Sequence, residues 1–128
     1  MKVAIPVFGT RVSPRFDCGP VLLLAEVDDG EVTASRYVAD AAEDPLRRIA
    51  RLRELGVEAV VCGAITGFLL RHLAANGIRV FPWIFAEAGE ALAALARGEL
   101  VPRAVGGVGR GRGRGAGGRG RRGPRWPR

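Results

Sequence analysis

Short apolar runs separated by turn residues fill the start of this 128-residue chain. Residues 2–7 and 21–27 are almost wholly apolar, which is typical of strands buried on both faces. Residues 32–38 are more polar and predict a third strand, at the edge of the sheet. The segment Asp-Asp-Gly-Glu at 28–31 predicts a hairpin turn between the last two runs, because Asp-Gly tolerates the positive φ that such turns need.

Helical periodicity begins after the third strand. Asp44 can cap a helix N-terminus, Pro45 is favoured at the first helical position, and Gly56 is a typical left-handed stop. The apolar residues between them recur at near-helical spacing. The remaining elements alternate, with a strand at 58–62, a helix at 65–75, a strand at 78–81 and a helix at 88–97.

The resulting order, β-β-β-α-β-α-β-α, predicts an α/β fold in which helices pack on a mixed five-stranded sheet. Because crossovers between parallel strands are right-handed, the strand order 3-2-1-4-5 is expected. The chain leaves the first and fourth strands in opposite directions, and ligands of open sheets bind beyond the carboxyl ends of strands at such a switch point. The candidate site is therefore expected just beyond residues 7 and 62.

Two cysteines are the first candidate chemistry, because this topology brings both to that crevice. Cys18 lies in the loop after the first strand, and Cys62 ends the fourth. Thiolates are soft ligands that suit iron–sulfur centres, but cysteine is also a common core residue. Two thiolates do not complete a four-cysteine cluster site, so a metal centre would need a dimer, other ligands or a cluster that brings its own.

His72 is the only histidine of the chain. It follows Phe68 by four residues and Leu69 by three, so it is expected on the apolar side of its helix. A core or rim position is the favoured interpretation, and a metal ligand is the alternative.

The turn from the fourth strand into the next helix, residues 63–67, is a candidate anion site. Free N–H groups at a helix start favour anions, although the segment lacks the lysine and spacing of a P-loop and a tight turn would use the same glycines. Loop arginines and an aromatic segment after the fifth strand could complete the site. The candidate ligand-binding residues are Phe8, Gly9, Arg11, Arg15, Gly63, Thr66, Gly67 and Trp83.

The charge of the chain divides at Pro102. The formal net charge is +7, but residues 1–102 hold 11 basic and all 13 acidic side chains, a balance of −2, while residues 103–128 carry +9. We therefore expect a folded domain at 1–102 and a disordered Gly/Arg-rich tail at 103–128. Such tails bind RNA and other polyanions, and a purely solubilising extension is the alternative.

Several protein classes are disfavoured. No apolar run approaches the ~20 residues of a membrane span, the N-terminus is unlike a signal peptide, and two cysteines do not make a disulfide scaffold. A cytoplasmic protein is expected. The chain has no persuasive Ser-His-Asp set and no paired catalytic carboxylates. The predicted sheet resembles ribonuclease H-like sheets, whose nucleases hold magnesium with acids at strand ends, but residues 7–9 and 61–63 contain none.

Several segments resemble one known family in combination. Residues 2–7 (KVAIPV) and 12–18 (VSPRFDC) are similar to the opening of the dinitrogenase iron–molybdenum cofactor biosynthesis family, which includes NifX-type carriers and the C-terminal domain of NifB. The later matching segments are 55–64, 75–80 and 90–100. The resemblance covers about residues 1–102.

This resemblance implies a three-layer ribonuclease H-like domain that binds or carries iron–sulfur or iron–molybdenum cluster precursors and is not an enzyme. The implied binding face is the loop from Ser13 to Cys18, together with Cys62 and Gly63, and the implied partners are cluster-assembly or acceptor proteins. A monomer or a homodimer is expected. The alternative hypotheses are a polyanion- or RNA-binding adaptor acting through the tail and a regulatory domain that senses a small anion at residues 63–67.

Overall fold

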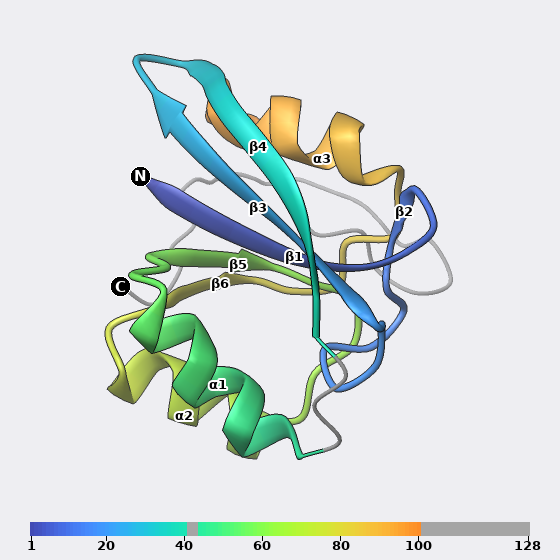
Figure 1. Ribbon diagram of the computed structural model, residues 1–128, viewed down its shortest axis with the longest axis vertical. Helices are drawn as coiled ribbons and strands as arrows, with labels where there is room; N and C mark the ends of the chain where they lie inside the picture. Colours follow the sequence, from blue (N-terminus) through green and yellow to red (C-terminus); the bar gives the residue numbers. More distant parts are fainter. Residues whose placement is uncertain (41–43, 101–128) are drawn as a thin grey trace, which may run out of the picture.

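The strands form one mixed sheet with helices on both faces (Figure 1). The computed structural model describes residues 1–40 and 44–100, so the predicted tail, its RNA-binding role and the boundary at Pro102 lie outside the described residues. The elements are β1 (Lys2–Phe8), β2 (Arg11–Val12), β3 (Val21–Asp28), β4 (Glu31–Ala39), α1 (Pro45–Glu54), β5 (Ala59–Val61), α2 (Gly67–Ala75), β6 (Arg79–Phe81) and α3 (Ala88–Ala96).

The main path of the sheet runs β4-β3-β1-β5-β6, and β2 pairs with β1 off this path. The β1–β3 and β3–β4 pairs are antiparallel, whereas β1–β5 and β5–β6 are parallel. Helices α1 and α2 cover one face and α3 the other, which confirms the predicted three-layer α/β class (Figure 1). The strand order differs from the predicted one by the additional strand β2.

Strand β2 forms inside the predicted loop because the chain turns tightly after β1. Gly9 has φ +59°, in the left-handed region that glycine adopts without strain. Phe8 then pairs with Arg11 and Val7 with Val12 in an antiparallel register. The hairpin directs the following loop back across the carboxyl end of β1, where Ser13 N–H donates to the carbonyl of Pro6 at 2.7 Å.

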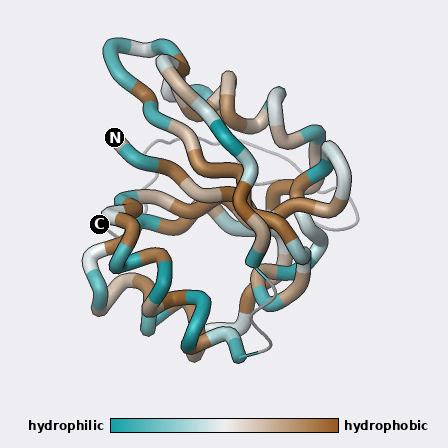
Figure 2. The backbone as a smooth tube through the Cα atoms, in the orientation of Figure 1, coloured by the Kyte–Doolittle hydropathy of each residue, from teal (hydrophilic) through white to brown (hydrophobic). Residues whose placement is uncertain are grey.

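Two hydrophobic clusters lie on opposite faces of the sheet. Ile5 and Leu92 belong to the cluster between the sheet and α3. Val60, Leu52 and Leu73 belong to the cluster between the sheet and α1 and α2. Figure 2 shows the hydrophobic positions concentrated in the central strands and the inward helix faces. Because the central strands β1 and β5 are buried on both sides, they hold the carboxyl-end loops on a rigid base.

The predicted turns and caps set the ends of the elements. Asp29 (φ 51°) and Gly30 (φ 79°) make the predicted β3–β4 hairpin turn. The Asp44 carboxylate accepts a hydrogen bond from Leu46 N–H at 2.9 Å and caps α1. Helix α2 begins two residues later than predicted, because Thr66 is its N-cap and accepts from Leu69 N–H at 3.3 Å.

Among the described residues, every helix is too short or too polar to cross a membrane.

Candidate functional site

Two loops meet at the carboxyl ends of the parallel strands β1 and β5, as the topology predicts. Ala64 N–H donates to the carbonyl of Pro14 at 2.7 Å, and Phe16 N–H donates to the carbonyl of Ala64 at 2.9 Å. Gly63 allows this approach, because a Cβ at that position would lie 2.4 Å from the Pro14 oxygen. The loop after β2 and the turn after β5 therefore form one continuous surface.

A pocket of ≈ 280 Å³ lies where these two loops meet the segment after β6. Its lining residues are Arg15, Asp17, Ala64, Ile65, Thr66, Leu69 and Trp83. Arg15, Thr66 and Trp83 were expected from the sequence as candidate ligand-binding residues. Asp17 was missed, although its place in the same short loop as Arg15 is a signal for it. The pocket thus combines an ion pair, a helix start and an aromatic wall.

Arg15 and Asp17, which both line this pocket, form a bidentate ion pair. Arg15 Nε donates to Asp17 Oδ1 at 2.9 Å and Nη2 donates to Oδ2 at 2.7 Å. The hydrogen bond and charge of Asp17, followed by the charge of Cys18, raise the pKa of the Arg15 guanidinium. The guanidinium therefore stays charged and is paired with the Asp17 carboxylate of its own loop.

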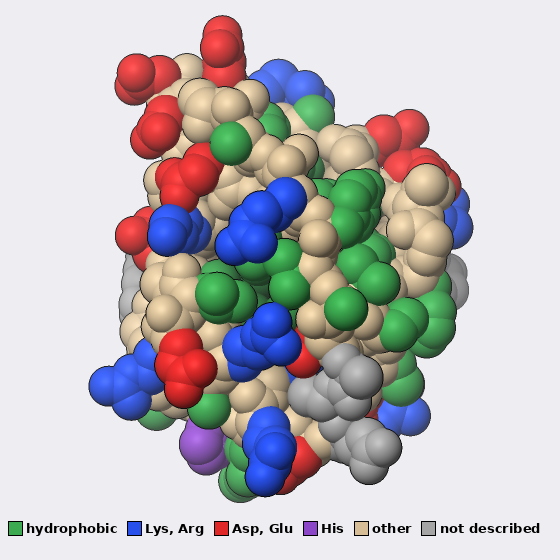
Figure 3. All heavy atoms as spheres, in the orientation of Figure 1, with side chains coloured by type: hydrophobic (Ala, Val, Ile, Leu, Met, Phe, Trp, Pro, Cys, Tyr) green, Lys and Arg blue, Asp and Glu red, His purple; other side chains and the backbone are tan. Residues whose placement is uncertain are grey.

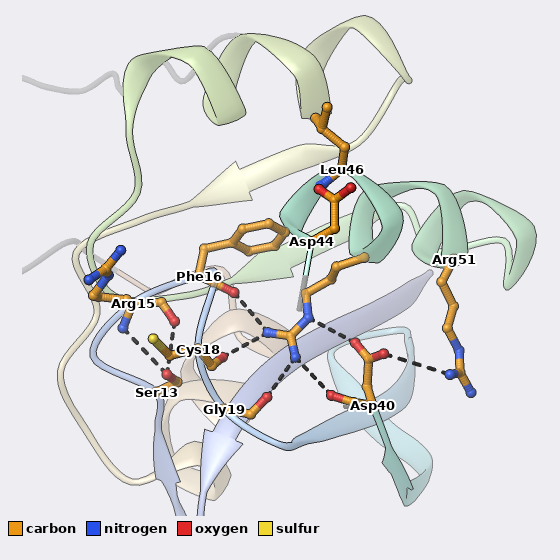
Figure 4. Close-up of polar contacts among 10 residues, drawn as sticks. Ser13, Arg15, Phe16, Cys18, Gly19, Asp40, Asp44, Leu46 and Arg51 are labelled. Atoms are coloured by element: carbon orange, nitrogen blue, oxygen red, sulfur yellow. Dashed lines mark hydrogen bonds and ion pairs between the residues drawn. The ribbon is translucent and has the colours of Figure 1, made fainter. Parts of the chain in front are cut away.

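Cys18 is partly buried, with a free thiol. Its N–H donates to the carbonyl of Arg15 at 3.2 Å, which forms a turn in the loop. Its sulfur lies toward Ser13 and Arg15, while its carbonyl points the opposite way (Figure 4). Ser13 is buried, and its hydroxyl donates to the Arg15 carbonyl at 2.8 Å, so its side chain shapes the loop from inside.

A buried arginine that the sequence interpretation missed holds the back of this loop (Figure 4). Arg48 lies on α1 and uses all five of its N–H groups. Nε donates to Asp40 Oδ2 at 2.8 Å, Nη1 to the carbonyls of Phe16 and Cys18 at 2.8 and 2.7 Å, and Nη2 to the carbonyls of Gly19 and Asp40 at 2.6 and 3.2 Å. Arg48 thereby fixes the Cys18 loop to α1 and to the end of β4.

Cys62 follows β5 and is fully buried in the cluster beneath α1 and α2. Burial raises the pKa of its thiol from 9.0 to about 12. A thiolate is the form that binds metal, so this environment favours the neutral packing role over the ligand role. The assignment of Cys62 as a metal ligand stays a prediction, and it requires the hydrophobic cluster around Cys62 to open.

The stability of the fold is expected to fall above pH 9 because of this buried thiol. The neutral form of Cys62 contributes stability that is complete below the unfolded-state pKa and is lost as the pH rises toward about 12. The expected loss is roughly 1.4 kcal/mol per pH unit in that window. Urea unfolding of the native chain and of Cys62→Ala between pH 8 and 11 measures it. Equal pH slopes in the two proteins would contradict the assignment.

Trp83 forms the aromatic wall with an unusual backbone. Its φ is +63°, which is a strained value for a bulky residue. Two backbone hydrogen bonds of 2.9 Å hold it there, from Trp83 N–H to the carbonyl of Gly63 and from Ile84 N–H to the carbonyl of Cys62. Its side chain remains 39% exposed. This geometry keeps an indole beside the pocket instead of inside the core.

The other expected site residues lie elsewhere. Phe8, Gly9 and Arg11 belong to the β1–β2 hairpin, where the Arg11 guanidinium pairs with Glu87 at 3.0 Å instead of lining the pocket. His72 was expected on the apolar side of α2, but it is exposed and its ring lies 5.4 Å from that of exposed Phe68. The spacing was interpreted wrongly because the inward face of α2 is set by Leu69 and Leu73.

Gly67 is the first residue of α2, next to the pocket-lining Thr66. The first turn of α2 contains no acidic residue, and the guanidinium of Arg71 lies 3.3 Å from where a Cβ of Gly67 would be. The electrostatics of this helix start therefore suit an anion. Within residues 1–40 and 44–100, no group of three or more His, Cys, Asp or Glu side chains is arranged to hold a metal ion.

Comparison with known proteins finds one matching family and several solved structures with a similar fold. A family model described as "Dinitrogenase iron-molybdenum cofactor" matches residues 1–98. No curated protein matches the chain in sequence.

Three solved structures share the fold. PH0822 is 19% identical, with a TM-score of 0.73, over 78% of this chain and 92% of that one. A Thermotoga protein (TM1290), provisionally described as a NifB protein, is 26% identical, with a TM-score of 0.60 over 79% and 91% of the two chains. The apo form of the orange protein from Desulfovibrio gigas is 19% identical, with a TM-score of 0.64 over 80% and 92%.

Proposed function

This chain belongs to the dinitrogenase iron–molybdenum cofactor family, and on that premise we propose that it binds an anionic metal–sulfur cluster, or a precursor of one, as cargo. The proposed role is that of a carrier or accessory protein. It would receive the cargo from one protein of cluster assembly and release it to another.

The observation that carries this proposal is the position of a partly buried thiol beside a pocket that contains an arginine and a helix start. Cys18 belongs to the same loop as Arg15, and its sulfur lies toward Arg15 and away from the Arg48 side of the loop (Figure 4). Arg15 in turn lines the pocket with Thr66 and Trp83. A soft ligand thus lies in the same short loop that supplies an arginine to the pocket.

This donor set suits a cluster that brings most of its own ligands. Metal–sulfur clusters with sulfide and acidic ligands are anionic, so a guanidinium and a helix start favour them. Cys18 would supply a single thiolate bond, and Trp83 would shield one side of the cargo from water. Few protein ligands give a site from which cargo can be transferred.

Anaerobic reconstitution with iron, sulfide and molybdate tests the proposal. We expect charge-transfer absorption in the native chain and a loss of most of it in Cys18→Ser, because that variant removes the thiolate. Elemental analysis of the gel-filtered protein gives the metal content independently.

Cys62→Ala is the matched control, because it removes the other thiol from a position fully buried in the core. Its spectrum is expected to stay close to that of the native chain. An unchanged spectrum in Cys18→Ser would contradict the role of Cys18, and absence of metal from the native chain would contradict the cargo.

A further inference from the structure

We propose that Asp17 is a built-in competitor for the cargo, occupying the guanidinium of Arg15 whenever the pocket is empty and thereby setting how readily an anion is bound and released. The inference rests on the proposed function and deepens it. It assigns to Asp17 a part in affinity that is separate from the thiolate bond of Cys18.

The geometry shows that Asp17 saturates the part of Arg15 that would recognise an anion. The two parallel hydrogen bonds, at 2.9 and 2.7 Å, use the bidentate edge of the guanidinium. Such an edge is the one that binds carboxylate and other oxyanions most strongly. An incoming anion must therefore displace Asp17 or accept the remaining N–H groups.

The exposure of the two partners shows that displacement is feasible. The Arg15 side chain is 61% exposed, and the Asp17 side chain is 26% exposed. Exposed ion pairs contribute little net free energy because water solvates the separated groups. The two hydrogen bonds orient Arg15, while their small net free energy lets an anion of higher charge displace Asp17.

Both partners line the same pocket, so the competition takes place at the binding site itself. With the pair intact, the two side chains contribute no net charge to the pocket. Removal of the Asp17 charge leaves Arg15 uncompensated beside the bound anion. The attraction between this freed guanidinium and a dianion a few ångströms away is then expected to tighten binding about tenfold, from Coulomb's law in a water-like dielectric.

Titration with tetrathiomolybdate, a dianion of molybdenum and sulfide, tests this inference on the full chain without oxygen. The signals followed are the Arg15 Nε–H and the Ala64 amide in ¹H–¹⁵N spectra, because they report on this pocket and not on the basic residues 103–128. The proteins compared are the native chain, Asp17→Asn, Arg15→Gln and the double variant. We expect Asp17→Asn to bind tetrathiomolybdate about tenfold more tightly than the native chain. In the variants that lack Arg15, the Ala64 amide signal alone reports binding.

The double variant separates competition from simple charge repulsion. If Asp17 acts by occupying Arg15, the gain from Asp17→Asn is clearly smaller once Arg15 is Gln, because only the direct repulsion between the Asp17 carboxylate and the anion is then removed. An equal gain in both backgrounds would overturn the inference. Glu31→Gln is the control for net charge, since Glu31 begins β4 at the β3–β4 hairpin, at the other end of the sheet from the pocket. Figure 3 shows acidic side chains gathered at this end of the molecule.

The outcomes also distinguish this inference from the proposed function. Unchanged or weaker binding in Asp17→Asn overturns the inference while a cluster on Cys18 can still form. Binding by Asp17→Asn but not by the native chain supports the competition and counts against the native cargo. Absence of binding in both proteins overturns the inference.

Discussion

Replacement of Arg48 by alanine is expected to lower the free energy of unfolding by about 3–5 kcal/mol, which is the usual cost of breaking a buried ion pair from one side. The total stability of a domain is roughly 5–15 kcal/mol, so much of the variant should be unfolded at moderate urea concentrations. Chemical unfolding followed by circular dichroism measures the loss.

The loss is large because Arg48 serves three segments at once. Without it, the Asp40 carboxylate is left buried, and the carbonyls of Phe16, Cys18 and Gly19 lose their donor. A buried acceptor without a partner costs about 1–3 kcal/mol. A lysine keeps the charge but has three donors from one nitrogen, so Arg48→Lys is expected to recover only part of the stability.

Arg51→Ala is the matched control for this variant. Arg51 lies one turn away at 43% exposure, and its guanidinium reaches the same Asp40 carboxylate at 3.7 Å. A loss of no more than about 1 kcal/mol is expected for such an exposed partner. Similar losses in Arg48→Ala and Arg51→Ala would show that the buried network does not hold the loop.

Replacement of Gly63 by alanine is expected to destabilise the protein by about 2–4 kcal/mol and to open the candidate site. The added Cβ would lie 2.4 Å from the oxygen and 2.6 Å from the carbon of the Pro14 carbonyl. Both are backbone atoms, so the loop itself must move. That movement breaks the Ala64 to Pro14 and Phe16 to Ala64 hydrogen bonds, of 2.7 and 2.9 Å.

Urea unfolding measures the stability of Gly63→Ala, and reconstitution measures its metal content. Gly89→Ala provides the control, because Gly89 lies in α3 with no atom near its missing Cβ. Alanine is the better helix former there, so unchanged or slightly higher stability is expected. A Gly63→Ala variant as stable as Gly89→Ala would refute the close approach of the two loops.

The fold could be predicted from sequence because local signals and long-range pattern agreed. Asp44 and Gly56 bracket α1, and the Asp-Gly turn at 29–30 fixes the β3–β4 hairpin. The short strand β2 was missed because two residues carry no periodicity, and only the position of Gly9 makes the turn that creates it.

The site was predictable only in outline. The convergence of the two loops follows from topology. The pairing of opposite charges within the pocket depends on side-chain placement that one sequence does not reveal. In α1, Leu46 shares the apolar near-helical spacing but is 38% exposed, while Arg48 is buried. The available signal for this buried network was the position of Arg48, next to Ile49 and one turn before Leu52. A charge on the apolar face of a helix requires a buried partner.

The network of bonds around the pocket also determines how a molecule can enter or leave it. Short hydrogen bonds join the loop after β2, Ala64 and the Trp83 backbone to one another or to the core. These described walls of the pocket are therefore held in place. Entry and exit then require only rotations of exposed side chains such as Arg15, which occur in picoseconds to nanoseconds. For the cargo proposed above, we therefore expect the residence time to depend on ligand exchange at the cargo and on the return of Asp17 to Arg15, and not on movement of these walls.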